Sequence, residues 1–298
     1  MNIKTSDNNL IRTFLNRLTL PKPNSHKGQN GRVLIIGGSS LFHSASLWAA
    51  EIASHFVDMV HYSSTKENEE IFLSLKKKFR NGMIVPQEKL MEYVKEDDAV
   101  LVGPGMMREG EEAKYTFNLI KSLIKNFPDK QFVFDAGALQ MMEPEWLLSL
   151  KKPAIVTPHQ KEFEKLFDVP CLPAGRSIHR SNIEEKVNLV QKMARKYKTI
   201  ILLKAIVDII SDGKETYVIE GGNAGLTKGG TGDILAGLTT ALSSTNPALI
   251  SAVSASILLK KTSEKLFQSK GYWYNVGNII ELIPEVLTRS VPLGSDLI

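Results

Sequence analysis

A glycine-rich segment with one late acid is the part of the sequence best suited to chemistry, and it reads Asn223-Ala-Gly-Leu-Thr-Lys-Gly-Gly-Thr-Gly-Asp233. Apolar residues follow it at helical spacing, which predicts that a helix begins there. Glycine lets a backbone approach a ligand closely, and the start of a helix offers free N–H groups and a positive dipole end to an anion. Lys228 adds a positive charge. The segment therefore predicts a site for an anionic ligand such as a phosphate group.

Asp233 lies in the first turn of this predicted helix, where the dipole favours its ionised form. A carboxylate beside an anion site makes little sense if the site only holds phosphate. It fits a site in which the carboxylate handles a hydroxyl proton while backbone N–H groups neutralise a phosphoryl group in transfer. The plainer alternative is a glycine-rich turn in which Asp233 only caps the helix, although such a turn does not need three glycines, a lysine and an acid together.

The elements that must position this segment alternate along the chain. Short runs rich in β-branched residues end at turn formers, and they cover 32–38, 58–63, 99–103, 132–135, 154–157, 200–204 and 207–211. Helical patterns cover 45–56, 109–126, 183–197, 234–243 and 250–267. Apolar strands with helices between them predict an α/β fold with a mostly parallel sheet covered on both faces. Such sheets bind ligands at the carboxyl ends of their strands.

Length and composition are those of an ordinary globular chain. Its 298 residues are 43% hydrophobic and 23% charged, with a formal net charge of +5. We expect an N-terminal helical extension over residues 1–25 and a single domain over 26–298. The scattered charges argue against a nucleic-acid partner, and no apolar run approaches the ~20 residues that cross a membrane. The single cysteine, Cys171, fits a reducing compartment, so we expect a cytoplasmic protein.

Several common motifs are absent from the sequence. It has no GxxxxGK[ST], GxGxxG, HExxH, CxxC or GxSxG. These absences disfavour P-loop proteins, Rossmann cofactor sites, zinc hydrolases, redox dithiols and α/β-hydrolases.

Further segments narrow the interpretation: GRVLIIGGS at 31–39, VGPG at 102–105, FDAGAL at 134–139, TPHQKE at 157–162 and LKA at 203–205. In this order they resemble the ADP/ATP-dependent NAD(P)H-hydrate dehydratases. The GGTGD end of the glycine-rich segment resembles the anion-hole motif of the ribokinase-like superfamily, to which those enzymes belong. The resemblance spans roughly residues 26–285 and implies a ribokinase-like three-layer αβα sandwich with a mostly parallel central sheet.

The resemblance also implies an activity. In that family, ADP or ATP phosphorylates the hydroxyl of hydrated NADH or NADPH, and loss of phosphate restores the dihydronicotinamide. It implies Mg²⁺ as cofactor and a homo-oligomer, often a tetramer. Because the 25 residues before the matched region cannot encode an epimerase domain, we expect a separate NAD(P)H-hydrate epimerase to work with this chain.

The resemblance assigns roles to individual residues. It implies that Asp233 is the catalytic aspartate and that Gly230 and Gly232 help to form the anion hole. The residues implied to bind the nucleotide are Lys204, Ala205, Ile206, Val207, Asp208, Asn223, Lys228, Gly229, Thr231 and Gly232. Those implied to contact the hydrated dinucleotide are Ala45, Gly105, His159 and Asp233. Glu162 would act near the phosphates through magnesium.

The sequence departs from the family at the site. The family usually has glycine after the lysine and threonine three residues further on, where this chain has Ala205 and Asp208. Asp208 would then place a negative charge near the phosphates unless magnesium or Lys204 offsets it. The second aspartate of the family's 134–139 run is Gly137 here, and a glycine of its 157–162 run is Lys161. The bulky 55–58 stretch replaces a glycine-rich one at an expected substrate wall.

Two other functions remain open at this point. One is a ribokinase-like kinase of a small hydroxyl-bearing metabolite, as the hydroxymethylpyrimidine and hydroxyethylthiazole kinases are, and the TPHQKE segment argues against it. The other is a nucleotide-binding relative without turnover, which Ala205 and Asp208 favour mildly. Retention of Asp233, Lys204 and His159 argues against the second. The sequence does not choose between ADP and ATP.

Overall fold

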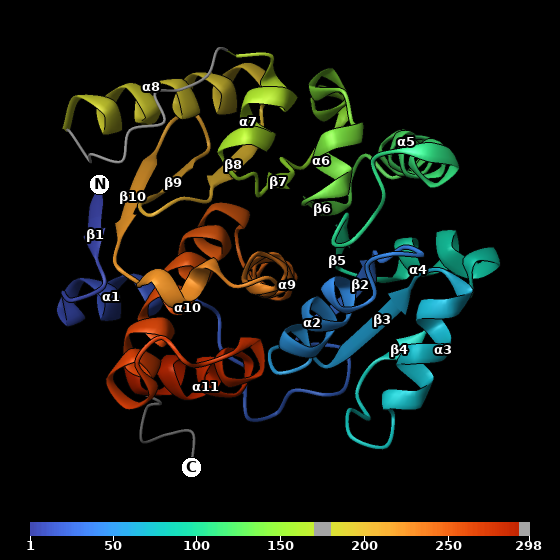
Figure 1. Ribbon diagram of the computed structural model, residues 1–298, viewed down its shortest axis with the longest axis horizontal. Coiled ribbons are helices and arrows are strands. Elements are labelled where there is room, and N and C mark those ends of the chain that lie inside the picture. The colour runs from blue at the N-terminus through green and yellow to red at the C-terminus, as the bar shows by residue number, and fades with distance from the viewer. Residues whose placement is uncertain (170–179, 292–298) are drawn as a thin grey trace.

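Ten strands form one sheet in a computed structural model that describes residues 1–169 and 180–291 (Figure 1). The order across the sheet is β1-β10-β9-β8-β7-β6-β5-β2-β3-β4, and every neighbouring pair is parallel except those that β9 makes with β8 and β10. The strands are β1 (Asn2–Lys4), β2 (Arg32–Ile36), β3 (Met59–Ser63), β4 (Met83–Ile84), β5 (Ala99–Val102), β6 (Gln131–Phe134), β7 (Ile155–Val156), β8 (Ile200–Leu203), β9 (Asp208–Ser211) and β10 (Thr216–Glu220). The predicted mostly parallel sheet is confirmed. Cys171 lies outside the described residues.

Helices cover both faces of the sheet, which completes three layers. They are α1 (Asn8–Leu15), α2 (Ser44–Ala53), α3 (Lys66–Leu75), α4 (Leu90–Glu96), α5 (Gly110–Asn126), α6 (Gly137–Met141), α7 (Gln160–Phe167), α8 (Arg180–Tyr197), α9 (Thr231–Ser243), α10 (Ala248–Lys270) and α11 (Val276–Ser290), with short 3₁₀ turns at Gln87–Lys89, Pro144–Ser149 and Ala224–Thr227. One core forms against α1, α2, α9, α10 and α11, and a second against α4 to α8. None of these helices is long and apolar enough to span a membrane.

The strands are apolar throughout because both of their faces are buried. In β2, Val33 and Ile35 belong to the first core, whereas Leu34 and Ile36 belong to the second. Side chains alternate across a strand, so a strand between two helical layers needs an apolar residue at every position. This explains why the sequence shows continuous apolar runs rather than alternation.

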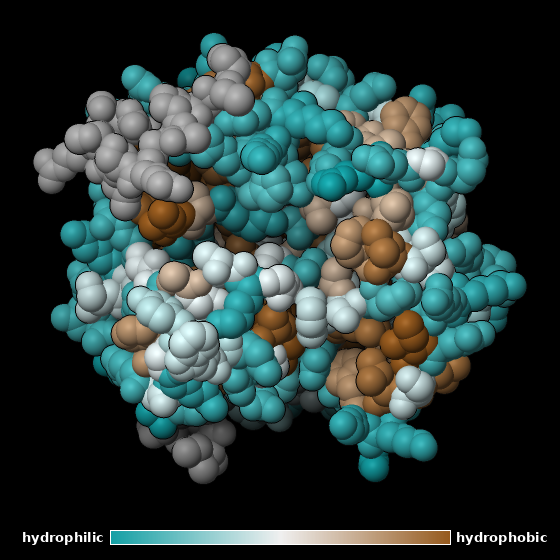
Figure 2. Space-filling model, in the orientation of Figure 1, coloured by the Kyte–Doolittle hydropathy of each residue, from teal (hydrophilic) through white to brown (hydrophobic). Residues whose placement is uncertain are grey.

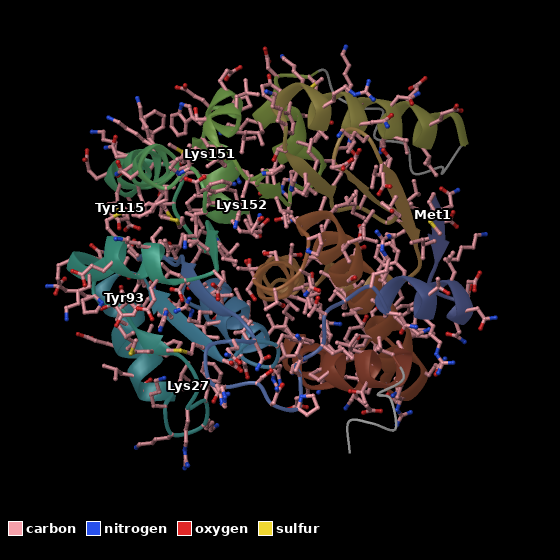
Figure 3. The ribbon with its side chains drawn as sticks, turned by 180° about the vertical axis from the view of Figure 1, so that it is seen from behind. Met1, Lys27, Tyr93, Tyr115, Lys151 and Lys152 are labelled. Atoms are coloured by element: carbon pink, nitrogen blue, oxygen red, sulfur yellow. The ribbon has the colours of Figure 1, made fainter. Side chains whose placement is uncertain are left out.

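The N-terminal segment contributes to the same core. The predicted helix is present as α1, capped by the Asp7 carboxylate, which accepts a hydrogen bond from the Leu10 N–H. Its residues Ile11, Phe14 and Leu15 are buried in the first core. The strand β1 before it was not predicted, and it extends the sheet by pairing with β10. Seen from behind, Met1 lies at this end of the molecule, while Tyr93 and Tyr115 lie at the other (Figure 3).

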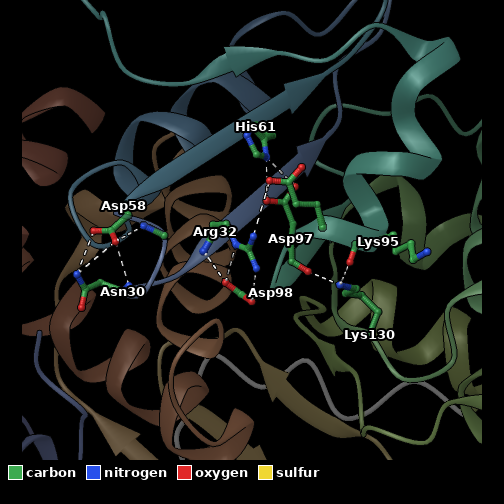
Figure 4. A network of polar contacts seen from close by, with 10 residues as sticks. Asn30, Arg32, Asp58, His61, Lys95, Asp97, Asp98 and Lys130 are labelled. Atoms are coloured by element: carbon green, nitrogen blue, oxygen red, sulfur yellow. Dashed lines mark hydrogen bonds and ion pairs between the residues drawn. The ribbon is translucent and has the colours of Figure 1, made fainter. Parts of the chain in front are cut away.

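A polar network closes the amino edge of the sheet (Figure 4). The Asp58 carboxylate accepts hydrogen bonds from the N–H groups of Gly28 and Asn30, and the buried His61 and Asp97 side chains are hydrogen-bonded at 2.8 Å. Ser244, just past the end of α9, packs against Gly31 at this edge, so α9 runs from one edge to the other, about 20 Å. The expectation that residues 55–58 form a substrate wall is therefore wrong, because they lie at the edge opposite Asp233.

Candidate active site

The central residues of the site meet at the carboxyl edge of the sheet. Lys204 follows β8, and its ammonium group lies 2.6 Å from Oδ1 of Asp135, which follows β6. The Thr157 hydroxyl, at the end of β7, donates to the same carboxylate oxygen at 2.8 Å. A Cβ added to Gly232 would lie 3.4 Å from the Lys204 Nζ. Lys204 thus lies between the strand ends and the first turn of α9.

Asp135, in the FDAGAL segment, has a central place in the site that its sequence context did not predict. Its side chain is almost fully buried, and Lys204 and Thr157 both bind its Oδ1. A buried carboxylate needs such partners, since an unpaired charge in the interior is costly. The available signal was its position: an aspartate directly after an apolar strand of a parallel sheet points to the carboxyl edge.

The first turn of α9 is open to an anion. Gly230 precedes the helix with φ of 99°, and a Cβ there would lie 2.6 Å from the Trp48 ring, so only glycine fits. Among the described residues, the N–H groups of Gly230 and Gly232 have no protein acceptor. The Thr231 hydroxyl donates to the carbonyls of Leu226 and Lys228 and holds the preceding loop. Around Gly229 there is free space. The predicted anion site is compatible with this geometry.

Asp233 is poised to exchange a proton near neutral pH. Burial is the main cause that raises the pKa of Asp233 to about 7, the charge of Asp135 adds to the rise, and Lys204 opposes it. Burial also works against the charge of Lys204, but Asp135 and Glu162 outweigh it and raise the pKa of Lys204. Lys204 therefore stays protonated at neutral pH. A carboxyl group with a pKa near the working pH is suited to general base catalysis.

His159 and Glu162 form the start of α7 together. The His159 Nδ1 accepts from the Glu162 N–H at 3.1 Å, and the Glu162 Oε2 accepts from the His159 N–H at 2.9 Å. Gln140 donates to the remaining oxygen of Glu162 at 3.2 Å. His159 also pairs with Lys204 in an isolated parallel bridge, and half of its side chain, 53%, is exposed. Both residues cap a helix, and both also face the carboxyl edge beside Lys204.

The described residues do not form a metal-binding site of their own. Within residues 1–169 and 180–291, no group of three or more His, Cys, Asp or Glu side chains is placed to hold one. Mg²⁺ that arrives with a nucleotide needs only one or two carboxylates, since phosphates and water supply its other ligands. Both oxygens of the buried Glu162 already accept hydrogen bonds from the protein. Glu162 therefore fits contact with Mg²⁺ through water rather than direct ligation.

On the expected substrate side, Ala45 and Gly105 are brought together. A Cβ added to Gly105 would lie 3.1 Å from the Ala45 Cβ and 3.2 Å from the Phe42 Cβ. Leu41 and Phe42, in the loop before α2, are 64% and 50% exposed. Hydrophobic residues gather on this side of the molecule, toward α2 and α3 (Figure 2). Phe42 was not predicted, because a single apolar residue in a loop carries no signal in one sequence.

The structure gives a reason for Gly137, where the family has an aspartate. A Cβ at this position would lie 2.2 Å from the Met106 carbonyl oxygen, so the backbone of the β5–α5 loop occupies the space that a side chain would need. Ala136 beside it has φ of 46°, an uncommon value for a residue with a side chain. Lys161, the other departure near this region, is exposed on α7.

The loop from Asn223 to Lys228 is fixed by residues around Tyr274. Asn223 accepts from the Gly225 N–H and the Tyr274 hydroxyl and donates to the Ser263 carbonyl. The Lys228 ammonium group donates to the Tyr272 carbonyl and lies 4.9 Å from the centre of the Tyr274 ring. Their side chains thus hold the loop itself, and contact with a nucleotide stays a prediction for both. Tyr272 and Tyr274 were not anticipated.

The turn between β8 and β9 differs from expectation at Asp208. Ala205 and Ile206 are exposed and Val207 is half-buried, but Asp208 is only 4% exposed. Its carboxylate accepts from the Ala205 N–H and the Ser256 hydroxyl, and the Lys260 Nζ lies 3.5 Å away. The Asp208 carboxylate is therefore compensated within the protein, and the cation beside it is Lys260 from α10.

Comparisons with known proteins identify the family of this chain. A family model described as NAD(P)H-hydrate dehydratase matches residues 33–285. The bifunctional NAD(P)H-hydrate repair enzyme Nnr of Methanocaldococcus jannaschii is 34% identical over 272 residues, which is 89% of this chain and 49% of that protein. The chain thus spans about half the length of that relative. The ADP-dependent (S)-NAD(P)H-hydrate dehydratase of Nitrosopumilus maritimus is 30% identical over 302 residues, 97% of each chain.

Solved structures share the fold. A ribokinase-like superfamily protein from Enterococcus faecalis superposes with a TM-score of 0.78 at 22% identity, over 94% of this chain and 95% of that one. The ADP/ATP-dependent NAD(P)H-hydrate dehydratase of Bacillus subtilis, co-crystallised with ATP and Mg²⁺, has a TM-score of 0.75 at 19% identity, over 97% and 99%. These likenesses confirm the predicted ribokinase-like sandwich.

Proposed function

Since the chain belongs to the NAD(P)H-hydrate dehydratase family, we propose that it restores NADH or NADPH from the hydrated cofactor at the expense of ADP or ATP. In chemical class it is a carbon–oxygen lyase whose substrates are the (S)-hydrate and an adenine nucleotide. The observation that carries the proposal is Asp233, a carboxyl group with a pKa of about 7 in the first turn of α9 beside Lys204.

Asp233 would act on the hydrate hydroxyl. In its ionised form it takes the hydroxyl proton while the oxygen attacks the terminal phosphoryl group of the nucleotide. The terminal phosphoryl group passes to that oxygen, and the nucleotide leaves one phosphate shorter. The phosphorylated hydroxyl is then a good leaving group, and loss of phosphate from its ring carbon together with loss of a proton from the neighbouring ring carbon restores the ring double bond. The nearly neutral pKa of Asp233 supports this role, because at pH 7 a substantial fraction of such a base is ionised and it can still hold the proton it accepts.

The open first turn of α9 and Lys204 would neutralise the phosphoryl group. The N–H groups of Gly230 and Gly232, which have no acceptor among the described residues, lie at the start of a helix, where negative charge is favoured. Lys204, protonated and next to Gly232, would add positive charge there. Such fixed donors stabilise charge that develops in a transition state without reorganising at the moment of reaction.

Magnesium would arrive with the nucleotide and shield its phosphates, with Glu162 as the water-mediated contact. The B. subtilis enzyme co-crystallised with ATP and Mg²⁺ supports this choice of cofactor. The residues proposed for the nucleotide are those from Lys204 to Val207 together with Asn223, Lys228, Gly229, Thr231 and Gly232, and the buried Asp208 would act on it by holding the turn. Those proposed for the hydrate are Ala45, Gly105, His159 and Asp233.

The remaining partner proposals rest on family membership. We propose a homo-oligomer such as a tetramer, and functional coupling to an NAD(P)H-hydrate epimerase, which would supply the S form of the hydrate. The bifunctional M. jannaschii relative, about twice as long as the matched region, supports a link between two repair activities. A cytoplasmic location remains a prediction from the single thiol of Cys171.

The test is recovery of the reduced-nicotinamide absorbance from purified hydrate after adding the protein with Mg²⁺ and either ADP or ATP. We expect recovery with at least one nucleotide and none when both are left out. Adenine-nucleotide binding without recovery would contradict the dehydratase and leave a non-catalytic relative. Nucleotide consumption with a small alcohol, but not with the hydrate, would instead identify a kinase.

A further inference from the structure

The turn between β8 and β9 is held from inside the protein by a pair of buried charges, Lys260 and Asp208. We propose that these two are positioning residues that orient the backbone of residues 205–207 toward the nucleotide. The proposal rests on the proposed function, because it assumes that this turn meets an adenine nucleotide. It goes further in giving a role to a lysine on α10 that no sequence motif marked.

Lys260 holds the carbonyl groups of the turn. Its side chain is nearly inaccessible, with 3% of the residue exposed, and its Nζ donates to the Ile206 carbonyl at 2.9 Å and the Ala205 carbonyl at 3.4 Å. Two consecutive carbonyl oxygens therefore point inward to one ammonium group. The carbonyl groups of exposed turns ordinarily accept hydrogen bonds from water. Because a buried lysine donates to two of them here, it fixes the conformation of the turn.

Asp208 fixes the other side of the same turn. One carboxylate oxygen accepts from the Ala205 N–H at 2.9 Å, and the other accepts from the Ser256 hydroxyl of α10 at 2.7 Å. The Lys260 Nζ lies 3.5 Å from the first oxygen, so each buried charge has its partner. Either charge alone would be costly at this depth, and α10 supplies both groups that Asp208 needs.

The consequence lies in the peptide geometry. The described peptide bonds are all trans, and in a trans peptide the N–H points opposite to the C=O. Because the carbonyls of Ala205 and Ile206 point to Lys260, the N–H groups of Ile206 and Val207 point away from it. Within the described residues neither N–H has a protein acceptor. Lys260 thus turns two adjacent donors outward, on the turn that also carries the 77% exposed Ile206 side chain.

This arrangement predicts the effect of placing threonine, the usual family residue, at position 208. Asp208→Thr removes no repulsion, because the carboxylate is already paired. It leaves Lys260 as an unpaired buried charge and frees the Ala205 N–H. We therefore expect Asp208→Thr to weaken nucleotide binding rather than tighten it, by a similar factor at low and high salt, since a buried pair is screened little.

The decisive experiment measures MgADP and MgATP binding by calorimetry, together with KM for each substrate. Lys260→Met keeps the unbranched apolar part of the side chain but removes its three donors, and we expect Kd for the nucleotide to rise about tenfold. We expect KM for the nucleotide to rise by a similar factor while KM for the hydrate stays unchanged. Lys265→Met, on the same helix but paired with Glu285, is the matched control and should bind nucleotide like the parent.

The double variant Asp208→Asn/Lys260→Met separates positioning from stability, because it removes both charges of the pair and leaves neither one unpaired. We expect this double variant to recover much of the unfolding midpoint lost in Lys260→Met but to keep the weak nucleotide binding. Affinity that returns to the parental value together with stability would overturn the proposal. Absence of nucleotide binding by the parent protein at millimolar concentration would instead overturn the proposed function, and this inference with it.

Discussion

The ammonium group of Lys204 and the carboxylate of Asp135 form an ion pair with an N–O distance of 2.6 Å directly beside the first turn of α9. The two partners act on Asp233 in opposite directions: Asp135 raises its pKa and Lys204 lowers it. Burial is the largest cause of the rise and Asp135 adds to it, so the pKa of Asp233 reaches about 7. The ion pair thus helps to set the pKa of Asp233 near neutral pH, where this carboxylate can accept a proton.

Asp233→Asn should abolish most turnover and leave the fold intact. The amide has nearly the shape of the carboxyl group but cannot accept the hydroxyl proton, so we expect kcat to fall about 10²–10⁴-fold. Nucleotide binding, followed by calorimetry, should survive, since the backbone donors of Gly230 and Gly232 are untouched. Activity within about threefold of the parent would remove general base catalysis by Asp233 from the mechanism.

The pH dependence should show the titration of Asp233. The base must be ionised in order to accept a proton, so kcat/KM should fall as the pH drops below about 7, with a slope near one decade per pH unit. Lys204 remains charged throughout this range because its pKa is raised. Rates measured from pH 5 to 9 with saturating nucleotide test this, and a profile flat down to pH 5 would contradict it.

The same pKa predicts that Asp233 costs stability at alkaline pH. Its folded pKa, about 7, lies above the ordinary value of 3.8, so the folded state binds more protons between these values. The contribution of Asp233 to the unfolding free energy of the parent therefore falls as the pH rises from about 4 to 7. Asp233→Asn should be more stable than the parent by about 1–3 kcal/mol at pH 8 and no more stable at pH 4. Urea unfolding at the two pH values measures the difference, and an equal gain at both would exclude titration as its cause.

Lys204→Met should move the acid limb of the pH profile to higher pH. The lysine lowers the pKa of Asp233, so its loss lets that pKa rise above about 7. Asp135 also loses its charged partner in this variant, and breaking a buried pair costs about 3–5 kcal/mol.

Lys204→Met should also reduce the stabilisation by nucleotide. At a hundredfold excess over the parental Kd, nucleotide should raise the unfolding free energy of the parent by about 2.7 kcal/mol, and that of the variant by less at the same concentration. Lys151→Met, which breaks the exposed pair with Asp129, is the control and should leave all three quantities unchanged.

Sequence reasoning predicted the fold where the apolar pattern was strong. The seven predicted strand segments correspond to β2, β3, β5, β6, β7, β8 and β9, and the predicted helices to α1, α2, α5, α8, α9 and α10. It missed β1, β4 and β10. The first two are three and two residues long at the edges of the sheet, where little apolar surface is buried. Their formation depends on pairing with a distant strand, which a local pattern cannot show.

At the site, the sequence predicted residue types better than their partners. The glycines and Asp233 at the start of α9 follow from local rules for helix termini. Asp208 was misjudged because Lys260 lies 52 positions further along the chain and reaches it only through the packing of α10 on β9. The role of Asp135 likewise depends on Lys204, which comes from a different strand.

The final prediction concerns Gly137, where the family usually has an aspartate. Two departures can be reversed in separate variants, Gly137→Asp and Lys161→Gly, and the structure predicts different outcomes. A side chain at 137 meets the Met106 carbonyl oxygen at 2.2 Å, so the β5–α5 loop must shift, and we expect a loss of about 1–3 kcal/mol.

Lys161 is exposed in the first turn of α7, so Lys161→Gly should cost no more than about 1 kcal/mol, the usual penalty of glycine in a helix. Urea unfolding of the two variants beside the parent makes the comparison. Because Met106 neighbours Gly105, the shift in Gly137→Asp should also raise KM for the hydrate and leave that for the nucleotide unchanged. If Gly137→Asp unfolds with the free energy of the parent, the β5–α5 loop moves aside at no cost. The close approach of Met106 would then not explain why position 137 is glycine.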